Sequence, residues 1–277
     1  MQWTEFVNTR AKTEWERLTA LESIFDAVSL RNLDRAAVRP GSRCLEVGAG
    51  AGSIARWMGE LAGPGNVVAT DLSTEFLDHL TELGIEVMHH DVTVDEPPGE
   101  FDVIHSRFVL DHLPDRDEAI KRLAAWLRPG GWLVVECATI APEMSSHPAV
   151  RRALESLGAV LSSTVGTHPT WARSLPVPLE AAGLTGCGAE GVLLPARGGS
   201  PLASWLKATH MLIERPAVES GLISRDELDE AYATYDSPSL WTTPGSPSAP
   251  GAGEHPTGEV DDRLRTLRCR GTHRGLQ

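Results

Sequence analysis

Arg-Cys-Leu-Glu-Val-Gly-Ala-Gly-Ala-Gly, residues 43–52, is the segment from which the rest of the chain can be interpreted. Its apolar run ends in a glycine-rich turn, and an apolar helix pattern follows over Ile54–Leu61. A second apolar run, Val67–Thr70, then ends in the carboxylate of Asp71. This order predicts the start of a parallel βαβ unit. Glycine suits such a turn because, without a Cβ, its backbone can turn sharply and approach a ligand closely.

The alternation of strand and helix patterns continues along the chain. Further strands are predicted at 85–89, 101–106 and 132–137, and amphipathic helices lie between them. Alternating strands and helices without repeats or linkers predict one doubly wound α/β domain with a mostly parallel, Rossmann-like sheet. In such a sheet, a carboxylate at the tip of the second strand, here Asp71, can accept hydrogen bonds from ribose hydroxyls.

Two classes of cofactor are bound with this geometry. The dinucleotide fingerprint G-x-G-x-x-G requires glycine at position 53, where this chain has Ser53. The spacing Gly48-x-Gly50-x-Gly52, with Glu46 before it, instead resembles the first motif of class I S-adenosylmethionine (SAM) methyltransferases. The run Leu-Arg-Pro-Gly-Gly-x-Leu-x-x-Glu at 127–136 resembles a further landmark of that family.

The resemblance implies SAM as the cofactor and a set of residues that bind it. Asp91 would bond the adenine amine and Val92 would pack on the ring, although an aspartate that only caps a loop is the alternative for Asp91. The backbone near Ser106 would face the methionine part, and Glu46 would bond the glycine loop or the amino-acid end of the cofactor. The N–H groups at Ser53 suit its carboxylate. The predicted cofactor-binding residues are Glu46, Gly48, Ala49, Gly50, Gly52, Asp71, Leu72, Asp91, Val92 and Ser106.

The acceptor side is less sharply defined. His112 and His168 are the candidate catalytic bases, with His105 and His210 as weaker ones, and each histidine also has a purely structural interpretation. Trp171, Trp205 and Met211 can form an apolar acceptor pocket, but Trp205 and Met211 lie at helical spacing, where such residues are more often core. Trp3, Trp15 and Arg17 are candidates for a lid over the cofactor.

Composition narrows the class of partner and the compartment. The 277 residues carry 25 Lys and Arg against 38 Asp and Glu, a net charge of −13, which disfavours nucleic-acid and anionic membrane surfaces. The 4 cysteines are scattered without a C-x-x-C pair, which favours thiols in a reducing cytoplasm over a disulfide scaffold or a metal site. No signal-peptide or membrane-spanning run is expected. A homodimer is left open.

The chain is expected to form a single methyltransferase domain over residues 1–243. Its parts would be N-terminal helices at 1–40 (Thr13–Phe25 and Leu30–Ala37), a SAM-binding core at 41–137, and acceptor-side helices and last strands at 138–243. We expect the N-terminal and late helices to form the lid and acceptor region, and N-terminal helices that only pack on the sheet are the alternative. A sixth strand is predicted at Gly188–Leu194 and the start of an antiparallel seventh at Leu240–Thr243. The proline-rich segment from 244 to 277 is predicted to be a disordered tail.

The leading functional hypothesis is therefore transfer of a methyl group from SAM to an oxygen, nitrogen or carbon atom of a small molecule, in bacterial secondary metabolism. An NAD(P)-binding oxidoreductase on the same sheet is one alternative, and Ser53 disfavours it. A SAM-binding partner module without catalysis is another. No metal is expected to take part, because the histidines lack the spacing of ligands.

Overall fold

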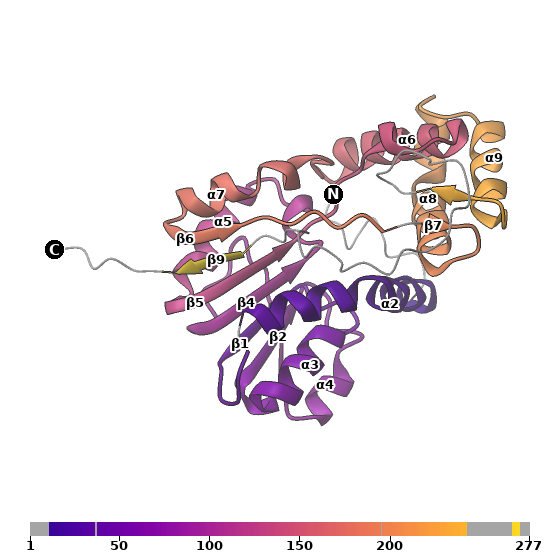
Figure 1. Cartoon of the computed structure of the whole chain (residues 1–277). Helices are drawn as coiled ribbons and strands as arrows, with labels where there is room; N and C mark the ends of the chain where they lie inside the picture. The colour runs from indigo at the N-terminus through magenta and orange to yellow at the C-terminus, as the bar shows by residue number, and fades with distance from the viewer. Residues whose placement is uncertain (1–10, 37, 195, 243–267, 272–277) are drawn as a thin grey trace, which may run out of the picture. The chain divides into compact units, whose positions relative to one another are not determined.

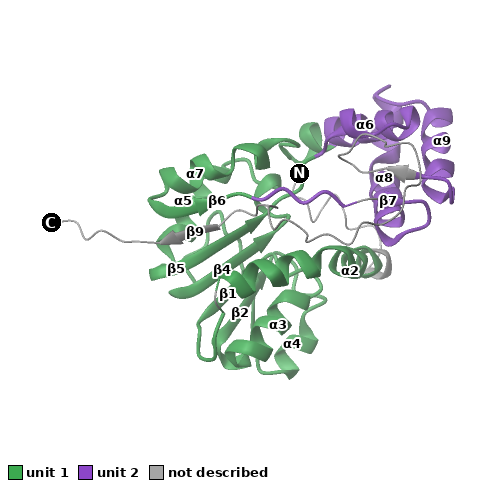
Figure 2. Cartoon of the chain, viewed as in Figure 1, with its two compact units in different colours: residues 1–139, 161–189, 267–277 green, residues 140–160, 190–266 purple. Residues whose placement is uncertain are grey.

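A computed structural model describes residues 11–36, 38–194, 196–242 and 268–271. Contacts divide the chain into two compact units, shown in Figure 2. Unit 1 comprises residues 1–139, 161–189 and 267–277, and unit 2 comprises 140–160 and 190–266. Each unit is described by itself below.

Unit 1 is built on a seven-stranded sheet in the order β3-β2-β1-β4-β5-β9-β6. The first five strands along the chain pair in parallel, whereas β9 is antiparallel to both of its neighbours. The strands are β1 (Cys44–Val47), β2 (Val67–Asp71), β3 (Glu86–His89), β4 (Phe101–Arg107), β5 (Leu127–Glu136), β6 (Leu184–Gly188) and β9 (Arg268–Gly271). The predicted Rossmann-like sheet is thus confirmed.

Helices cover both faces of this sheet (Figure 1). One face packs against α2 (Ala11–Arg35), α3 (Ser53–Ala62) and α4 (Asp78–Glu82), and the other against α5 (Arg116–Ala125) and α7 (Pro176–Ala181). Alternate residues of β1 enter the two cores, because successive side chains of a strand point to opposite faces: Leu45 and Val47 join one cluster and Cys44 the other. Short 3-10 turns lie at Pro64–Asn66, Leu110–His112, Pro142–Met144 and Trp171–Ser174.

Unit 2 is mainly helical. It contains most of α6 (Pro148–Thr164), together with α8 (Pro201–Glu219), α9 (Arg225–Asp236) and a two-stranded sheet of β7 (Ala196–Arg197) and β8 (Trp241–Thr242). A capping box begins α9: the Ser224 hydroxyl accepts a hydrogen bond from the Glu227 N–H, and the Glu227 carboxylate accepts one from the Ser224 N–H.

Several predicted boundaries were wrong. The N-terminal segment forms one continuous helix, α2, rather than two, because Leu30 and Leu33 extend the apolar stripe of the same helix into the core. The sixth strand lies at 184–188 and not at 188–194. Trp241–Thr242 pairs with β7 in the small sheet, and the antiparallel strand expected beside β5 is formed by residues 268–271. That strand contradicts the disordered tail for these residues, and the rest of 244–277 lies outside the described part.

The cysteines differ in their bonding. Cys44 and Cys137 are free thiols as expected, whereas Cys187 takes part in a disulfide, so the thiol prediction was wrong there.

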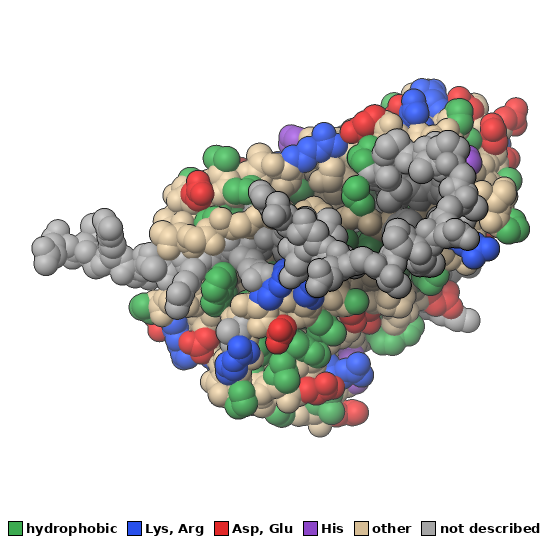
Figure 3. Space-filling model, in the orientation of Figure 1, with side chains coloured by type: hydrophobic (Ala, Val, Ile, Leu, Met, Phe, Trp, Pro, Cys, Tyr) green, Lys and Arg blue, Asp and Glu red, His purple; other side chains and the backbone are tan. Residues whose placement is uncertain are grey.

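On the face drawn in Figure 3, acidic and basic side chains are interspersed among the coloured residues. None of the helices in the described part of the chain combines the length and apolar character needed to cross a membrane.

Candidate cofactor site

The glycine loop joins β1 to α3 in a conformation that requires glycine. Gly48, Gly50 and Gly52 have φ angles of 74°, 61° and 94°, in the left-handed region that side chains with a Cβ rarely adopt. The Gly48 and Ala49 N–H groups donate to the Thr70 carbonyl at 2.8 and 3.0 Å, which holds the loop against the end of β2. The loop therefore presents backbone, not side chains, at the carboxyl edge of the sheet.

Asp71 lies beside this loop at the tip of β2. Its Oδ2 accepts a hydrogen bond from the Gly50 N–H at 2.9 Å, and its Oδ1 accepts one from the Ser73 N–H at 3.0 Å. Burial raises the pKa of Asp71, while hydrogen bonds from the backbone of Gly50, Ser73 and the adjacent Leu72 act in the opposite direction. A carboxylate oxygen has two lone pairs, so Asp71 can hold the loop and still accept bonds from a ligand's hydroxyl groups.

Residues at the ends of the next strands complete this edge. After β3, the Asp91 Oδ1 accepts bonds from the Thr93 N–H and hydroxyl at 2.9 and 2.6 Å, so the loop-capping interpretation of Asp91 describes this oxygen. Val92 is buried in the apolar cluster that contains Leu45 and Val47. At the end of β4, the Ser106 hydroxyl is buried and has no hydrogen-bond partner within the described residues. Phe108 follows with a φ of 55°, unusual for a residue other than glycine.

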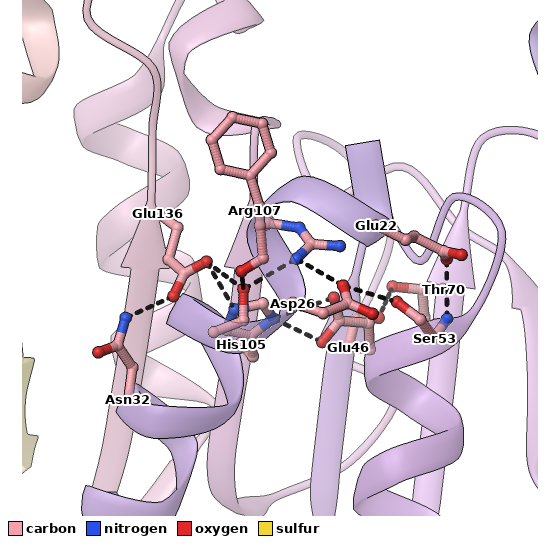
Figure 4. Close-up of polar contacts among 11 residues, drawn as sticks. Glu22, Asp26, Asn32, Glu46, Ser53, Thr70, His105, Arg107 and Glu136 are labelled. Carbon is pink, nitrogen blue, oxygen red and sulfur yellow. Dashed lines mark hydrogen bonds and ion pairs between the residues drawn. The ribbon is translucent and has the colours of Figure 1, made fainter. Parts of the chain in front are cut away.

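Glu46 does not bond the glycine loop, contrary to one of the two expectations for it. Its carboxylate oxygens lie 2.7 and 3.0 Å from the Nδ1 atom of His105, and both side chains are buried (Figure 4). Glu136 lies on the other side of the ring, with Oε2 3.7 Å from His105 Nε2. Although burial alone would lower it, the pKa of His105 is raised to about 9 by these two carboxylates. The ring is fully buried between two carboxylates, which supports the structural interpretation of His105 over a catalytic one.

Helix α2 adds polar residues that the sequence analysis did not assign to the site. Glu22 accepts a hydrogen bond from the Ser53 N–H, and Asp26 accepts one from the Ser53 hydroxyl, at 2.9 and 3.0 Å. Arg107 donates to both Asp26 and Ser29 (Figure 4). One signal was available in the sequence: residues 22, 26 and 29 recur at i, i+4 and i+7, so these polar residues share one face of the helix.

On the acceptor side, His112 is placed in a short turn after β4. Its Nδ1 lies 2.7 Å from the hydroxyl oxygen of Thr167. Burial lowers the pKa of His112, and the charges of Arg17 and Arg116 lower it further against the opposing charge of Asp111. The imidazole is therefore neutral at pH 7, which a base requires. His168 has an exposed side chain, and its backbone N–H donates to the Asp111 carbonyl at 3.0 Å.

The aromatic and lid candidates have different surroundings. Trp171 is buried in the apolar cluster that contains Leu45 and Val47, with the guanidinium carbon of Arg116 5.7 Å from its ring centroid. Trp15 is 40% exposed and lies 5.6 Å from the ring of Phe76, and Arg17 pairs with Glu14.

Three other candidates lie on α8 of unit 2. They are the half-buried Trp205, the exposed Met211, and His210, which is buried with Nδ1 2.6 Å from the Leu206 carbonyl. Trp3 lies outside the described residues.

A family model described as a methyltransferase domain matches residues 17–186. The match extends over most of α2, the glycine loop and β1–β5, and so over more than half of the chain. The chain belongs to this methyltransferase family. Enzymes of the family use SAM as the methyl donor. The left-handed glycines and the adjacent carboxylate of Asp71 fit this group, because they leave side-chain-free backbone next to an acceptor for ribose hydroxyls.

Curated relatives share only part of this methyltransferase. Methyltransferase str2 of Strobilurus tenacellus is 29% identical over 185 residues, which are 64% of this chain and 66% of that protein. The ubiquinone biosynthesis O-methyltransferase of Thiobacillus denitrificans is 36% identical over 113 residues, which are 38% of this chain and 47% of that enzyme. The chain thus spans about half to two thirds of the length of these relatives.

Solved structures share the fold over most of the chain. The phosphoethanolamine N-methyltransferase 2 of Haemonchus contortus in complex with SAM superposes with a TM-score of 0.57 and 16% identity, covering 99% of this chain and 60% of that one. The YcgJ protein of Bacillus subtilis gives a TM-score of 0.52 and 16% identity, covering 87% and 96%. Identities this low show a common fold and do not indicate a common substrate.

Proposed function

We propose that this methyltransferase transfers the methyl group of SAM to an oxygen, nitrogen or carbon nucleophile of a small organic molecule, including molecules of bacterial secondary metabolism. One observation carries the proposal: the backbone of the glycine loop and the carboxylate of Asp71 meet at the carboxyl edge of the sheet. A ligand with a ribose ring fits that combination. The net charge of −13 favours a small acceptor over a nucleic acid.

SAM supplies an already activated methyl group, so the protein has little covalent chemistry to perform. The chain must align the acceptor with the methyl carbon at about 3 Å and exclude water. Asp71 would hold the ribose, and the side-chain-free backbone of the loop would lie against the rest of the cofactor. For an acceptor that must lose a proton, His112 would take it, because its lowered pKa keeps the ring neutral at pH 7.

Titration calorimetry with S-adenosylhomocysteine (SAH) and with NAD(P) tests cofactor choice. We expect saturable binding of SAH and none of NAD(P), and the reverse result would overturn the proposal. Labelled SAM incubated with panels of aromatic, polyketide and indole-like acceptors then tests for turnover. Label transferred to RNA or protein, and to none of the small molecules, would contradict the proposed class of acceptor.

A further inference from the structure

Helix α2 lies across the loops that follow β1 and β4, at the edge where the cofactor is proposed to bind. The Leu18 side chain faces Gly50, where an added Cβ would lie 3.5 Å from Leu18 Cδ2. One turn further along α2, the Glu22 carboxylate accepts the Ser53 N–H. Phe25 stacks edge-on against Phe108 with ring centroids 4.9 Å apart. One face of α2 therefore contacts the glycine loop, the start of α3 and the loop after β4.

The polar part of this contact uses donors that suit a carboxylate. The Ser53 N–H belongs to the first turn of the ten-residue helix α3, where unpaired N–H groups and the helix dipole favour an anion. The Ser53 hydroxyl and an Arg107 N–H lie alongside and converge on one oxygen, Asp26 Oδ1, each at 3.0 Å. The Arg107 side chain is only 8% exposed, so this guanidinium is shielded from water. Leaving its charge without an anionic partner would therefore cost much free energy.

We propose that Glu22 and Asp26 stand in for the carboxylate of the cofactor's amino-acid end, and that cofactor binding exchanges one carboxylate for another on Ser53 and Arg107. This inference rests on the proposed function. In this state the chain's own acidic residues satisfy the donors, and α2 is held over the glycine loop. The cofactor's carboxylate must displace the Glu22 and Asp26 side chains to reach the donors, so its apparent affinity falls with the fraction of molecules in which these side chains have left them.

Charge-neutral variants separate this exchange from the opposite possibility, in which Glu22 and Asp26 bind the ammonium group of the cofactor. Glu22→Gln and Asp26→Asn keep an oxygen acceptor and the shape of the side chain but hold the donors less firmly, because hydrogen bonds to a charged partner are the stronger ones. Glu16→Gln makes the same charge change at an exposed position of the same helix and is the control.

The probes are SAH, which carries the amino-acid end, and 5′-methylthioadenosine, which lacks it. By calorimetry we expect Glu22→Gln and Asp26→Asn each to tighten SAH by about threefold or more, with methylthioadenosine and the Glu16→Gln control unchanged. Circular dichroism melts establish that each variant is folded, and the second variant serves if one of them is not.

Weaker binding of SAH by the variants would overturn the inference in favour of ammonium recognition, and unchanged binding would overturn it outright. Equal tightening of both probes would also contradict it, because the effect would then not depend on the carboxylate. Failure of the proposed function looks different: neither the wild type nor the folded variants would then bind SAH.

Discussion

The Nδ1 atom of His105 lies 2.7 Å from Glu46 Oε2. The two residues face each other on the adjacent strands β4 and β1, and both side chains are buried. Glu136 approaches the same ring from β5, and its own carboxylate is held by Ser29 and Asn32 of α2 at 2.5 and 2.6 Å. The His105 imidazolium thus lies between two buried carboxylates, and the charge of Arg107 also favours the ionised form of Glu46. Burial raises the pKa of Glu46, whereas bonds from His105 and α2 hold the pKa of Glu136 below its ordinary value despite its burial.

Replacing His105 should therefore destabilise the fold. His105→Gln removes the positive charge that lies between Glu46 and Glu136 and leaves Glu46 with the charge of Arg107. We expect a loss of about 3–5 kcal/mol in the free energy of unfolding, the range for breaking a buried ion pair. Chemical denaturation measures it. His89→Gln, at an exposed position of β3, is the matched control and should change little. A loss below about 1 kcal/mol, the usual limit for an exposed pair, would show that the carboxylates are not charged in the folded state.

The same group predicts how stability depends on pH. The pKa of His105 is about 9 in the folded chain, above its ordinary value of 6.5, so folding favours the protonated ring. This contribution is fully present below about pH 6.5, the unfolded pKa, and is lost as the pH rises through about 9. Unfolding free energies measured between these values should fall for the wild type and fall less for His105→Gln. Parallel curves for the two proteins would contradict a raised pKa.

The sequence predicted strands that are apolar and buried better than strands that are defined mainly by their pairing partners. Strands β1 and β2 were recognisable because their short runs, Cys44–Val47 and Val67–Asp71, are buried on both faces over almost their whole length. The antiparallel strand at Arg268–Gly271 carries no such run, and its pairing with β5 and β6 is a tertiary effect that local propensity does not report. The sixth strand was misplaced for the same reason, since β6 contains two glycines and only one fully buried residue.

In the candidate site, too, residues that are neighbours in a sequence motif could be predicted, whereas residues that only the fold brings together could not. The glycine loop and Asp71 are adjacent in a motif, and the structure joins them as expected through the Gly50 N–H. The bond between Glu46 and His105 joins residues 59 positions apart, and only the register of β1 on β4 brings them together. The role of Glu22 depends on where α2 docks, which its amphipathic pattern does not specify.

Gly48 gives a prediction about the loop itself. A Cβ at this position would collide with Val109 Cγ2, and its φ of 74° is strained for any other residue. We expect Gly48→Ala to lower the free energy of unfolding by about 2–5 kcal/mol, the sum of left-handed strain and overpacking. Gly130→Ala is the control, because it has a similar φ of 83° with no atom near the added Cβ, and should show the strain alone.

The collision can be separated from the strain by a double-mutant cycle. Val109→Ala removes the colliding methyl group, so Gly48→Ala should cost less in that background than in the wild type. Denaturation of the four proteins measures the coupling. Simple additivity of the two substitutions would mean that Val109 withdraws freely and that the collision contributes nothing.

Asp71 should matter for the cofactor more than for the fold. Asp71→Ala removes the acceptor proposed for the ribose hydroxyls and also the bond to the Gly50 N–H. We expect SAH binding to weaken by about 1–3 kcal/mol, the range for losing a hydrogen bond to a charged group. Calorimetry measures the change, with Asp78→Ala at an exposed position of α4 as the control. An unchanged affinity for SAH would remove Asp71 from the cofactor site.

His112 should affect turnover without affecting the cofactor. If it takes a proton from the acceptor, His112→Ala should slow methyl transfer by about 10²–10⁴-fold, the usual contribution of a general base, and leave SAH affinity unchanged. Because burial lowers the pKa of His112, the wild-type rate should be flat near pH 7 and fall only below about pH 6.5, the ordinary value for histidine.

Thr167→Val tests how the ring of His112 is held. The 2.7 Å contact between His112 Nδ1 and the Thr167 hydroxyl fixes the orientation of the imidazole, and the ring donates its Nδ1–H there only in the tautomer that leaves Nε2 able to accept a proton. Removing the hydroxyl should lower kcat by a smaller factor than His112→Ala and should leave KM for SAM near its wild-type value. Turnover assays with labelled SAM measure both constants, with His89→Ala as the surface control. Wild-type kcat in both His112→Ala and Thr167→Val would show that the acceptor needs no base, because a nucleophile that is already deprotonated requires alignment alone.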